Sequence, residues 1–311
     1  MSILVTLPVI VPLAAFALTL ACWRAPKLRG WAVAAGALAS LGVAIALIAE
    51  VSREGALAIH VGAWPAGFAI ALAADRLSAL MVLLAAIIGA ATLLFAKDEP
   101  GAESRSPAFG PAAFLLLAGV NGAFVTADLF NLYVWFEVML MGSFALLAIG
   151  GGARRTEGAL KYVTLNLLSS AIFLAAAGAI YAAARSLSLA ELSLRMPTIA
   201  AENPALAASF AVLLLVAFGI KAGLFPLFFW LPSSYHTAPF AVSALFAGLL
   251  TKVGVYAMLR VLPLVFEGLS APFELLLALA AFTMLAGVLG AISQGAIRRI
   301  LGFHIVSQIG Y

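Results

Sequence analysis

The sequence has few charged residues, only 10% of its 311 positions, and it contains one cysteine and three histidines. With 65% hydrophobic residues beside this low charge, the composition excludes an ordinary water-soluble domain. The single cysteine, Cys22, cannot form an internal disulfide. No CxxC, HExxH or GxxxxGK[ST] pattern occurs, and the histidines are too far apart for a recognisable metal-binding motif. We therefore expect neither a metal site nor a cofactor.

Long hydrophobic runs dominate what is present. A helix needs about 20 mainly apolar residues to cross the hydrocarbon core of a bilayer. The runs predict an all-α, polytopic transmembrane helix bundle with about ten spans, at 2–22, 30–50, 77–96, 107–126, 129–150, 160–184, 206–230, 239–262, 272–293 and from about 297 onwards.

Three segments between the runs are not predicted to span. Segment 59–72 has glycine and proline between two short β-prone runs, which predicts an external β-hairpin after span two. Segment 97–106 is polar and is expected to be a cytoplasmic loop. Segment 186–205 contains two prolines and is expected to be a longer outside connection.

The distribution of basic residues predicts the orientation. With the N-terminus outside, the inner loops hold Arg24, Lys27, Arg29, Lys97, Arg105, Arg154, Arg155, Lys161, Arg298 and Arg299. The outer loops hold only Arg53, Arg76, Arg185, Arg195 and Arg260. The positive-inside rule therefore favours an external, periplasmic N-terminus in a bacterial inner membrane. The first run lacks preceding basic residues, so it is expected to be a span and not a cleaved signal peptide.

Three charged residues lie near the middle of predicted spans: Glu137, Lys221 and Lys252. Such a group costs about 2.5–3.5 kcal/mol at the bilayer centre on insertion scales, so it indicates a function and a partner. The alternative for Glu137 is a structural ion pair or helix–helix hydrogen bond, and for Lys221 it is snorkelling to the interface. A lysine with a movable acid partner can hold or release a proton, as a proton relay requires.

Pro226 lies five residues after Lys221 and predicts that span seven is a broken helix, since proline removes an intrahelical hydrogen bond. Interrupted helices inside a membrane are tolerated where the backbone faces protein or water, and they commonly form ion sites in transporters. The proline therefore strengthens the functional interpretation of Lys221.

Several other polar residues are candidates for the same path. His236 follows span seven and His304 lies in the last helix; each is either a relay group or a histidine hydrogen-bonded to backbone. Ser169 and Ser170 in span six either line a wet path or serve helix packing. Asp128, at the start of span five, is predicted to be a helix N-cap.

Four stretches together carry a family resemblance: "ADLFNLYVWFEVMLMGSFALLA", "FGIKAGLFPLFFWLPSSYHTAP", "LLTKVGVYAMLR" and "RRILGFHIVSQIGY". They resemble the antiporter-like membrane subunits shared by respiratory complex I, membrane-bound hydrogenases and Mrp-type Na⁺/H⁺ antiporters, and they are most similar to the D-type subunits of the Mrp branch. Gln308, where relatives from complex I often have histidine, also favours the Mrp branch.

The resemblance implies fourteen helices with two inverted five-helix repeats. It divides this chain into three N-terminal helices with the hairpin (1–106), a first proton-translocating repeat (107–265) and the start of a second repeat, truncated in span ten (266–311). It also implies that Glu137 pairs with Lys221, that Lys252 begins a central polar axis, and that His236 and His304 are candidate members of the path.

The expected function is that of a proton-translocating subunit of a multisubunit Na⁺/H⁺ antiporter, a secondary transporter and not an enzyme. Its expected partners are other subunits of the complex, protons, Na⁺ and the lipid bilayer, with no nucleic acid. Two alternatives stay open: a pump subunit of an NADH:quinone oxidoreductase or hydrogenase, and a structural fragment that conducts nothing.

Overall fold

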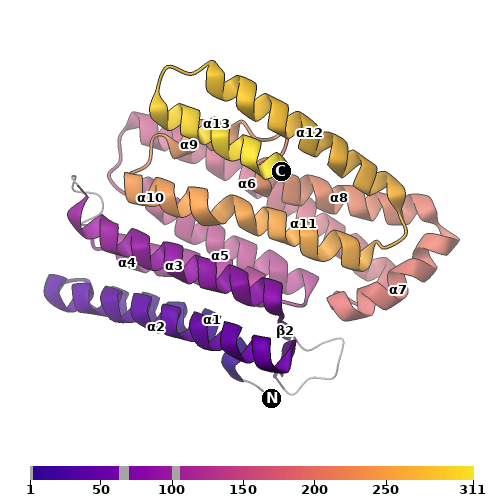
Figure 1. The fold of residues 1–311 in the computed structure, drawn as a ribbon, viewed down its shortest axis with the longest axis horizontal. Helices are drawn as coiled ribbons and strands as arrows, with labels where there is room; N and C mark the ends of the chain where they lie inside the picture. The colour runs from indigo at the N-terminus through magenta and orange to yellow at the C-terminus, as the bar shows by residue number, and fades with distance from the viewer. Residues whose placement is uncertain (1–2, 63–69, 100–105) are drawn as a thin grey trace. The chain divides into compact units, whose positions relative to one another are not determined.

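The computed structural model describes residues 3–62, 70–99 and 106–311, which are almost entirely helical (Figure 1). Contacts divide the chain into two compact units. The first comprises Met1–Thr156 and Ala238–Leu249, and the second comprises Glu157–Thr237 and Leu250–Tyr311. The predicted segments 1–106, 107–265 and 266–311 were defined by the repeat that the family resemblance implies. Their division of the chain differs from these two units and stays a prediction.

The first unit is built around one buried helix, α4. Its elements are a 3₁₀ turn at Ile3–Val5, α1 (Leu7–Ala21), α2 (Pro26–Glu54), α3 (Arg76–Asp98), α4 (Phe109–Val125), α5 (Leu129–Ala148) and α10 (Phe240–Leu245). Helix α4 packs against α1, α3 and α5, and every residue in it except Leu115 is buried. Small residues allow this packing: a Cβ on Gly142 of α5 would lie 2.6 Å from the backbone nitrogen of Leu116.

The strand pairing of the predicted hairpin is confirmed, and the strands extend two residues beyond the predicted segment 59–72 at each end. Strand β1 (Leu57–Val61) pairs antiparallel with β2 (Ile70–Ala74), from Leu57 opposite Ala74 to Val61 opposite Ile70. The rest of the predicted hairpin, 63–69, lies outside the described residues. Strand β2 is anchored to the helices because the backbone N–H of Ala127 donates to the carbonyl of Ala71 over 2.9 Å.

Asp128 caps α5, as predicted. Its carboxylate accepts a hydrogen bond of 2.7 Å from the backbone N–H of Asn131. Burial raises the pKa of Asp128, and hydrogen bonds from the backbone N–H groups of Asn131 and Phe130 oppose that rise. The Asp128 carboxylate therefore accepts from backbone N–H groups that the first turn of a helix otherwise leaves without hydrogen-bond partners.

The second unit contains α6 (Ala153–Ala184, which enters it at Glu157), α7 (Leu189–Glu202), α8 (Pro204–Ala222), α9 (Trp230–Tyr235), α11 (Thr251–Val265), α12 (Ser270–Ile292) and α13 (Ile297–Gly310). Figure 1 shows α12 and α13 side by side in yellow. Gly310 lets them approach closely, since a Cβ there would lie 2.6 Å from the carbonyl oxygen of Ala280. Helix α8 packs against α7, α11 and α12.

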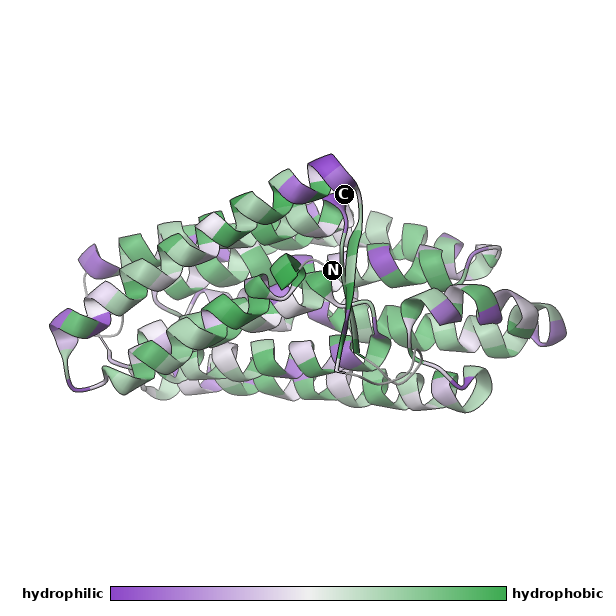
Figure 2. Cartoon of the chain, turned by 90° about the horizontal axis from the view of Figure 1, so that it is seen from below, coloured by the Kyte–Doolittle hydropathy of each residue, from purple (hydrophilic) through white to green (hydrophobic). Residues whose placement is uncertain are grey.

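Seven helices in the described part of the chain are long and apolar enough to cross a membrane, and α1 and α4 are shorter apolar helices. They correspond to the first nine predicted spans, and α13 corresponds to the tenth. Hydrophobic residues cover most of the length of these helices (Figure 2). The predicted multi-pass helical fold is therefore confirmed.

Segment 186–205, predicted only as a longer outside connection, contains helix α7 at Leu189–Glu202. Helix α7 buries Leu189, Leu192 and Met196, whose spacing places them on one face of a helix. On it, Arg195 pairs with Glu191 over 2.8 Å. Both prolines of the segment are helical: Pro197 lies within α7 and Pro204 is the first residue of α8, a position that proline favours.

Candidate functional site

Lys221 is buried, with 2% of its surface exposed, in the last turn of α8. Its Nζ donates a hydrogen bond of 3.2 Å to Oγ of Ser170, which is itself buried on α6. The C-terminal end of a helix carries partial negative charge, which favours a cation in the last turn. Within the second unit the ammonium group of Lys221 is directed to a buried hydroxyl.

The predicted break in span seven is confirmed, but it begins three residues before Pro226. Helix α8 ends at Ala222, and Gly223 adopts a left-handed conformation with φ of 86°. Glycine adopts this conformation without the strain that a side chain causes, and proline commonly follows such a cap. Gly223 therefore ends the helix, and Pro226 prevents its continuation.

The backbone groups released by this break find partners. The carbonyl of Gly219 accepts from the N–H groups of Gly223 and Leu224, each over 2.9 Å. The indole N–H of Trp230 donates to the carbonyl of Ile220 over 2.9 Å. The N–H of Phe225 donates to Oγ1 of Thr283 on α12 over 2.9 Å. An interruption at membrane depth is thus stabilised by protein groups around Lys221.

The two candidate serines have different contacts. Ser170 accepts from the Lys221 ammonium, whereas Ser169 donates from Oγ to the backbone carbonyl of Ala217 over 2.7 Å. Ser169 thus joins α6 to α8 by a hydrogen bond of the kind expected for helix packing, and only Ser170 contacts an ionisable candidate directly.

Lys252 is half-buried and is the second residue of α11. It follows a π-helical turn at Phe246–Leu250, which joins α10 to α11 in one continuous run. Such turns are frequent at functional sites. The preceding residue, Thr251, is fully buried, and its hydroxyl has no hydrogen-bond partner among the described residues.

Helices α8 and α11 approach closely between the two lysines. A Cβ on Gly254, two residues after Lys252, would lie 2.6 Å from the backbone nitrogen of Ala222 and 3.0 Å from the carbonyl carbon of Lys221. Glycine is needed because any side chain would collide with backbone atoms. The backbone segments that carry Lys221 and Lys252 are therefore neighbours.

Replacing Gly254 with valine is expected to lower the melting temperature by about 5 °C or more, because overpacking here displaces backbone and not a flexible side chain. The matched control is Gly178→Val on α6, where an added Cβ meets nothing within 4 Å. Differential scanning fluorimetry in detergent measures both. Equal melting temperatures for the two variants would contradict the close approach.

Glu137 is half-buried in the middle of α5, one turn after Tyr133, with which it interacts electrostatically. It belongs to the first unit, whereas Lys221 and Lys252 belong to the second. The Glu137–Lys221 pair stays a prediction.

The histidines lie on elements of the second unit that pack together. His236 follows α9, and its Nδ1 lies 2.8 Å from the carbonyl oxygen of Pro232, the backbone contact expected of a structural histidine. His304 is exposed on α13. Helix α13 packs against α9, where Gly302 faces Pro232. Membership of either histidine in a path stays a prediction.

Glu99, which no sequence pattern singled out, is 3% exposed and follows α3. Its carboxylate accepts hydrogen bonds from the backbone N–H of Phe240, over 2.6 Å, and of Ala241, over 3.4 Å, at the start of α10. An anion at a helix N-terminus is favourable. No local signal marked this contact because the partners are 141 and 142 positions away.

Replacing Glu99 with glutamine is expected to cost about 1–2 kcal/mol of stability, because a charge-assisted cap of α10 becomes a neutral one. Asp98→Asn, at the neighbouring exposed carboxylate, is the matched control and should change little. Thermal unfolding in detergent measures both variants. A melting temperature for Glu99→Gln as high as that of the control would show that the negative charge contributes nothing.

Three comparisons place these features among known proteins. Residues 126–311 match the family described as NADH:quinone oxidoreductase/Mrp antiporter, transmembrane. The D subunit of the Na⁺/H⁺ antiporter of Alkalihalophilus pseudofirmus is 41% identical over 312 aligned positions, which cover 100% of this chain and 63% of the relative.

Two solved structures are similar along the whole chain. The Mrp complex from Dietzia sp. DQ12-45-1b has a chain with a TM-score of 0.90 and 33% identity, covering 100% of this chain and 58% of that one. The membrane-bound sulfane sulfur reductase, an archaeal respiratory membrane complex, has one with a TM-score of 0.93 and 27% identity, covering 99% and 63%. The chain thus spans somewhat less than two thirds of the length of each of these relatives.

Proposed function

Because the chain belongs to the NADH:quinone oxidoreductase/Mrp antiporter transmembrane family, we propose that it is a proton-translocating part of the D-type subunit in a multisubunit Na⁺/H⁺ antiporter. The observation that carries the proposal is Lys221, a buried lysine at a helix break, hydrogen-bonded to Ser170. A buried ammonium group inside a membrane costs stability, so its presence indicates a function that retains it.

Lys221 and Lys252 have complementary roles in this proposal. Lys252 takes up and releases the proton, and Lys221, on the neighbouring backbone segment, sets how strongly a proton at Lys252 is repelled. Two like charges about 8 Å apart at an effective dielectric constant of about 20 repel by about 2 kcal/mol. That energy changes proton occupancy about 30-fold, enough to switch a poised site.

Glu137 is the movable partner in the proposed mechanism. Opening and closing of a Glu137–Lys221 ion pair moves the charge that Lys252 experiences. The buried Thr251 hydroxyl beside Lys252 can accept or donate a hydrogen bond along the path. Ser170, His236 and His304 are proposed as further members of that path, and the break at Gly223 and Pro226 lets Lys221 lie among polar groups inside the membrane.

The proposal extends to location and partners. We place the protein in a bacterial inner membrane with its N-terminus outside, by the distribution of its basic residues. Its partners are other antiporter subunits, with Na⁺ and H⁺ as the exchanged ions.

A second candidate function is proton pumping in a redox complex. The similarity to a chain of an archaeal respiratory membrane complex favours it. In that case partner subunits carry the redox centres, because the chain has no metal-binding motif, and the same lysines serve the pump.

Everted membrane vesicles test the two candidates. The complete complex that contains this chain is expressed in cells lacking their own antiporters, and respiration sets up a pH gradient. We expect added Na⁺ to collapse the gradient, and not to do so when the gene for this chain is deleted. Proton uptake driven by substrate oxidation, with iron–sulfur proteins co-purifying, would favour the pump; assembly without either activity would leave a structural role.

A further inference from the structure

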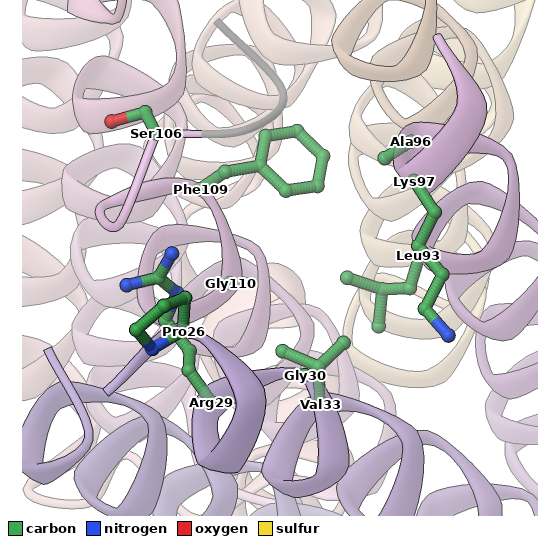
Figure 3. A pocket seen from close by; sticks show the side chains of 10 residues that line it. All are labelled: Pro26, Arg29, Gly30, Val33, Leu93, Ala96, Lys97, Ser106, Phe109 and Gly110. Carbon is green, nitrogen blue, oxygen red and sulfur yellow. The ribbon is translucent and has the colours of Figure 1, made fainter. Parts of the chain in front are cut away.

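A pocket of about 370 Å³ opens in the first unit where α2 begins, α3 ends and α4 begins (Figure 3). Val33, Leu93 and Phe109 form apolar walls, with Gly30 beside them. Figure 3 shows Arg29 and Lys97 on opposite sides of the opening. None of the described residues that line the pocket is acidic.

The pocket lies at one end of two helices that are long and apolar enough to cross a membrane. Helices α2 and α3 are both long enough to span, and the pocket is at their shared end. Trp23 and Trp31, at the start of α2, are 42% and 76% exposed. Tryptophan is enriched where headgroups meet the hydrocarbon core.

The cations of the pocket are arranged to receive an anion. One guanidinium nitrogen of Arg29, Nη1, donates to the carbonyl oxygen of Trp23 over 2.8 Å, which holds the side chain beside the pocket. This contact uses one of five N–H donors. Lys97 is exposed and also lines an adjoining depression of about 290 Å³, together with Lys27 and Trp31. The nearby carboxylate of Glu99 is bound to the backbone of α10.

We propose that this pocket binds an anionic phospholipid, with the phosphate group between Arg29 and Lys97 and an acyl chain along Val33, Leu93 and Phe109. Arginine and lysine match phosphate oxygens, and basic pockets between membrane helices bind anionic headgroups. The apolar walls distinguish a lipid from free phosphate, because only a lipid has a chain to cover them.

Native mass spectrometry of the purified protein in detergent tests the proposal, with dioleoyl phosphatidylglycerol and dioleoyl phosphatidylcholine as probes. We expect phosphatidylglycerol to bind about tenfold more tightly, and Arg29→Gln/Lys97→Gln to remove that preference. Arg53→Gln/Arg76→Gln is the matched control, since it removes one exposed charge from the opposite end of each of the same two helices. The control should keep the preference.

A second pair of variants separates a built pocket from general charge attraction. Gly30 lines the pocket and an added Cβ there meets nothing within 4 Å, so Gly30→Leu adds apolar volume at the pocket and leaves both cations in the sequence. We expect it to weaken phosphatidylglycerol binding about tenfold. Gly42→Leu, on the same helix with equally open surroundings, should bind normally.

Three results would overturn the proposal. The first is an unchanged preference of Arg29→Gln/Lys97→Gln for phosphatidylglycerol over phosphatidylcholine, and the second is unchanged phosphatidylglycerol binding by Gly30→Leu. The third is displacement of the bound lipid by inorganic phosphate as effectively as by phosphatidylglycerol. Unchanged lipid binding in Arg29→Gln/Lys97→Gln, with loss of co-purifying subunits, would instead assign the pocket to a protein partner. Monodisperse elution of every variant in gel filtration confirms that folding is intact.

Discussion

Replacing Lys221 with methionine is expected to lower Na⁺-driven proton movement about 30-fold while the complex still assembles, given the repulsion of about 2 kcal/mol estimated above. Methionine has a similar length and no charge. Because methionine fills a similar volume, the packing around this buried position is expected to be kept. We therefore expect transport to fall while the melting temperature stays unchanged, a result that distinguishes a functional lysine from a structural one. Wild-type transport by an assembled Lys221→Met complex would sink the proposed mechanism.

Two neighbouring serines supply a matched control for Lys221. Ser170→Ala removes the hydroxyl that accepts from its ammonium, and Ser169→Ala removes a hydroxyl that donates to the carbonyl of Ala217. A hydrogen bond to a charged group contributes about 1.5–3 kcal/mol, so Ser170→Ala is expected to impair transport severalfold or more. Ser169→Ala should change stability slightly and transport little. Vesicle pH-gradient measurements decide between them.

A double-mutant cycle with Glu137 tests the predicted ion pair. If Glu137 and Lys221 act as an ion pair, the double variant Glu137→Gln/Lys221→Met should transport at least as fast as the slower of the two single variants. Independent roles would multiply the two defects instead. The cycle needs no assumption about the distance between the two side chains.

Hydropathy alone predicted the helical spans because apolar length is a local property of the sequence. The break in span seven was also predictable, but Pro226 was given the role that Gly223 fills, since a left-handed glycine ends the helix before the proline is reached. Helix α7 was not predicted; its signal in the sequence is the spacing of Leu189, Leu192 and Met196, which places them on one face of a helix.

Other features had no local signal. The π-helical turn at Phe246–Leu250 is uniformly apolar, so its sequence pattern does not differ from that of an α-helix. The contact of Glu99 with α10 depends on residues far away in sequence. Lys221 and Lys252 were recognised as costly groups inside spans, but their proximity depends on Gly254, a residue unremarkable in sequence. The pairing with Glu137 came only from the family resemblance and stays a prediction.

Two substitutions of Lys252 distinguish a proton relay from a fixed positive charge. Lysine can release its proton when its surroundings change, whereas arginine keeps its proton under all physiological conditions. If Lys252 carries the transported proton, Lys252→Arg should be nearly as inactive as Lys252→Met, each about 100-fold or more below the wild type. If the site needs only positive charge, arginine should restore transport and methionine should not.

The measurement is the rate at which Na⁺ collapses the pH gradient in everted vesicles, normalised to assembled complex. Lys161→Arg, at an exposed lysine paired with Glu157, is the matched control for the substitution itself and should transport normally. Near wild-type transport by Lys252→Arg would exclude proton release at this position, and transport by Lys252→Met would exclude any role of its charge. We expect Lys252→Arg and Lys252→Met to be inactive and Lys161→Arg to transport normally. The reason is that the half-buried Lys252, which follows the π-helical turn, must change its protonation state in each transport cycle.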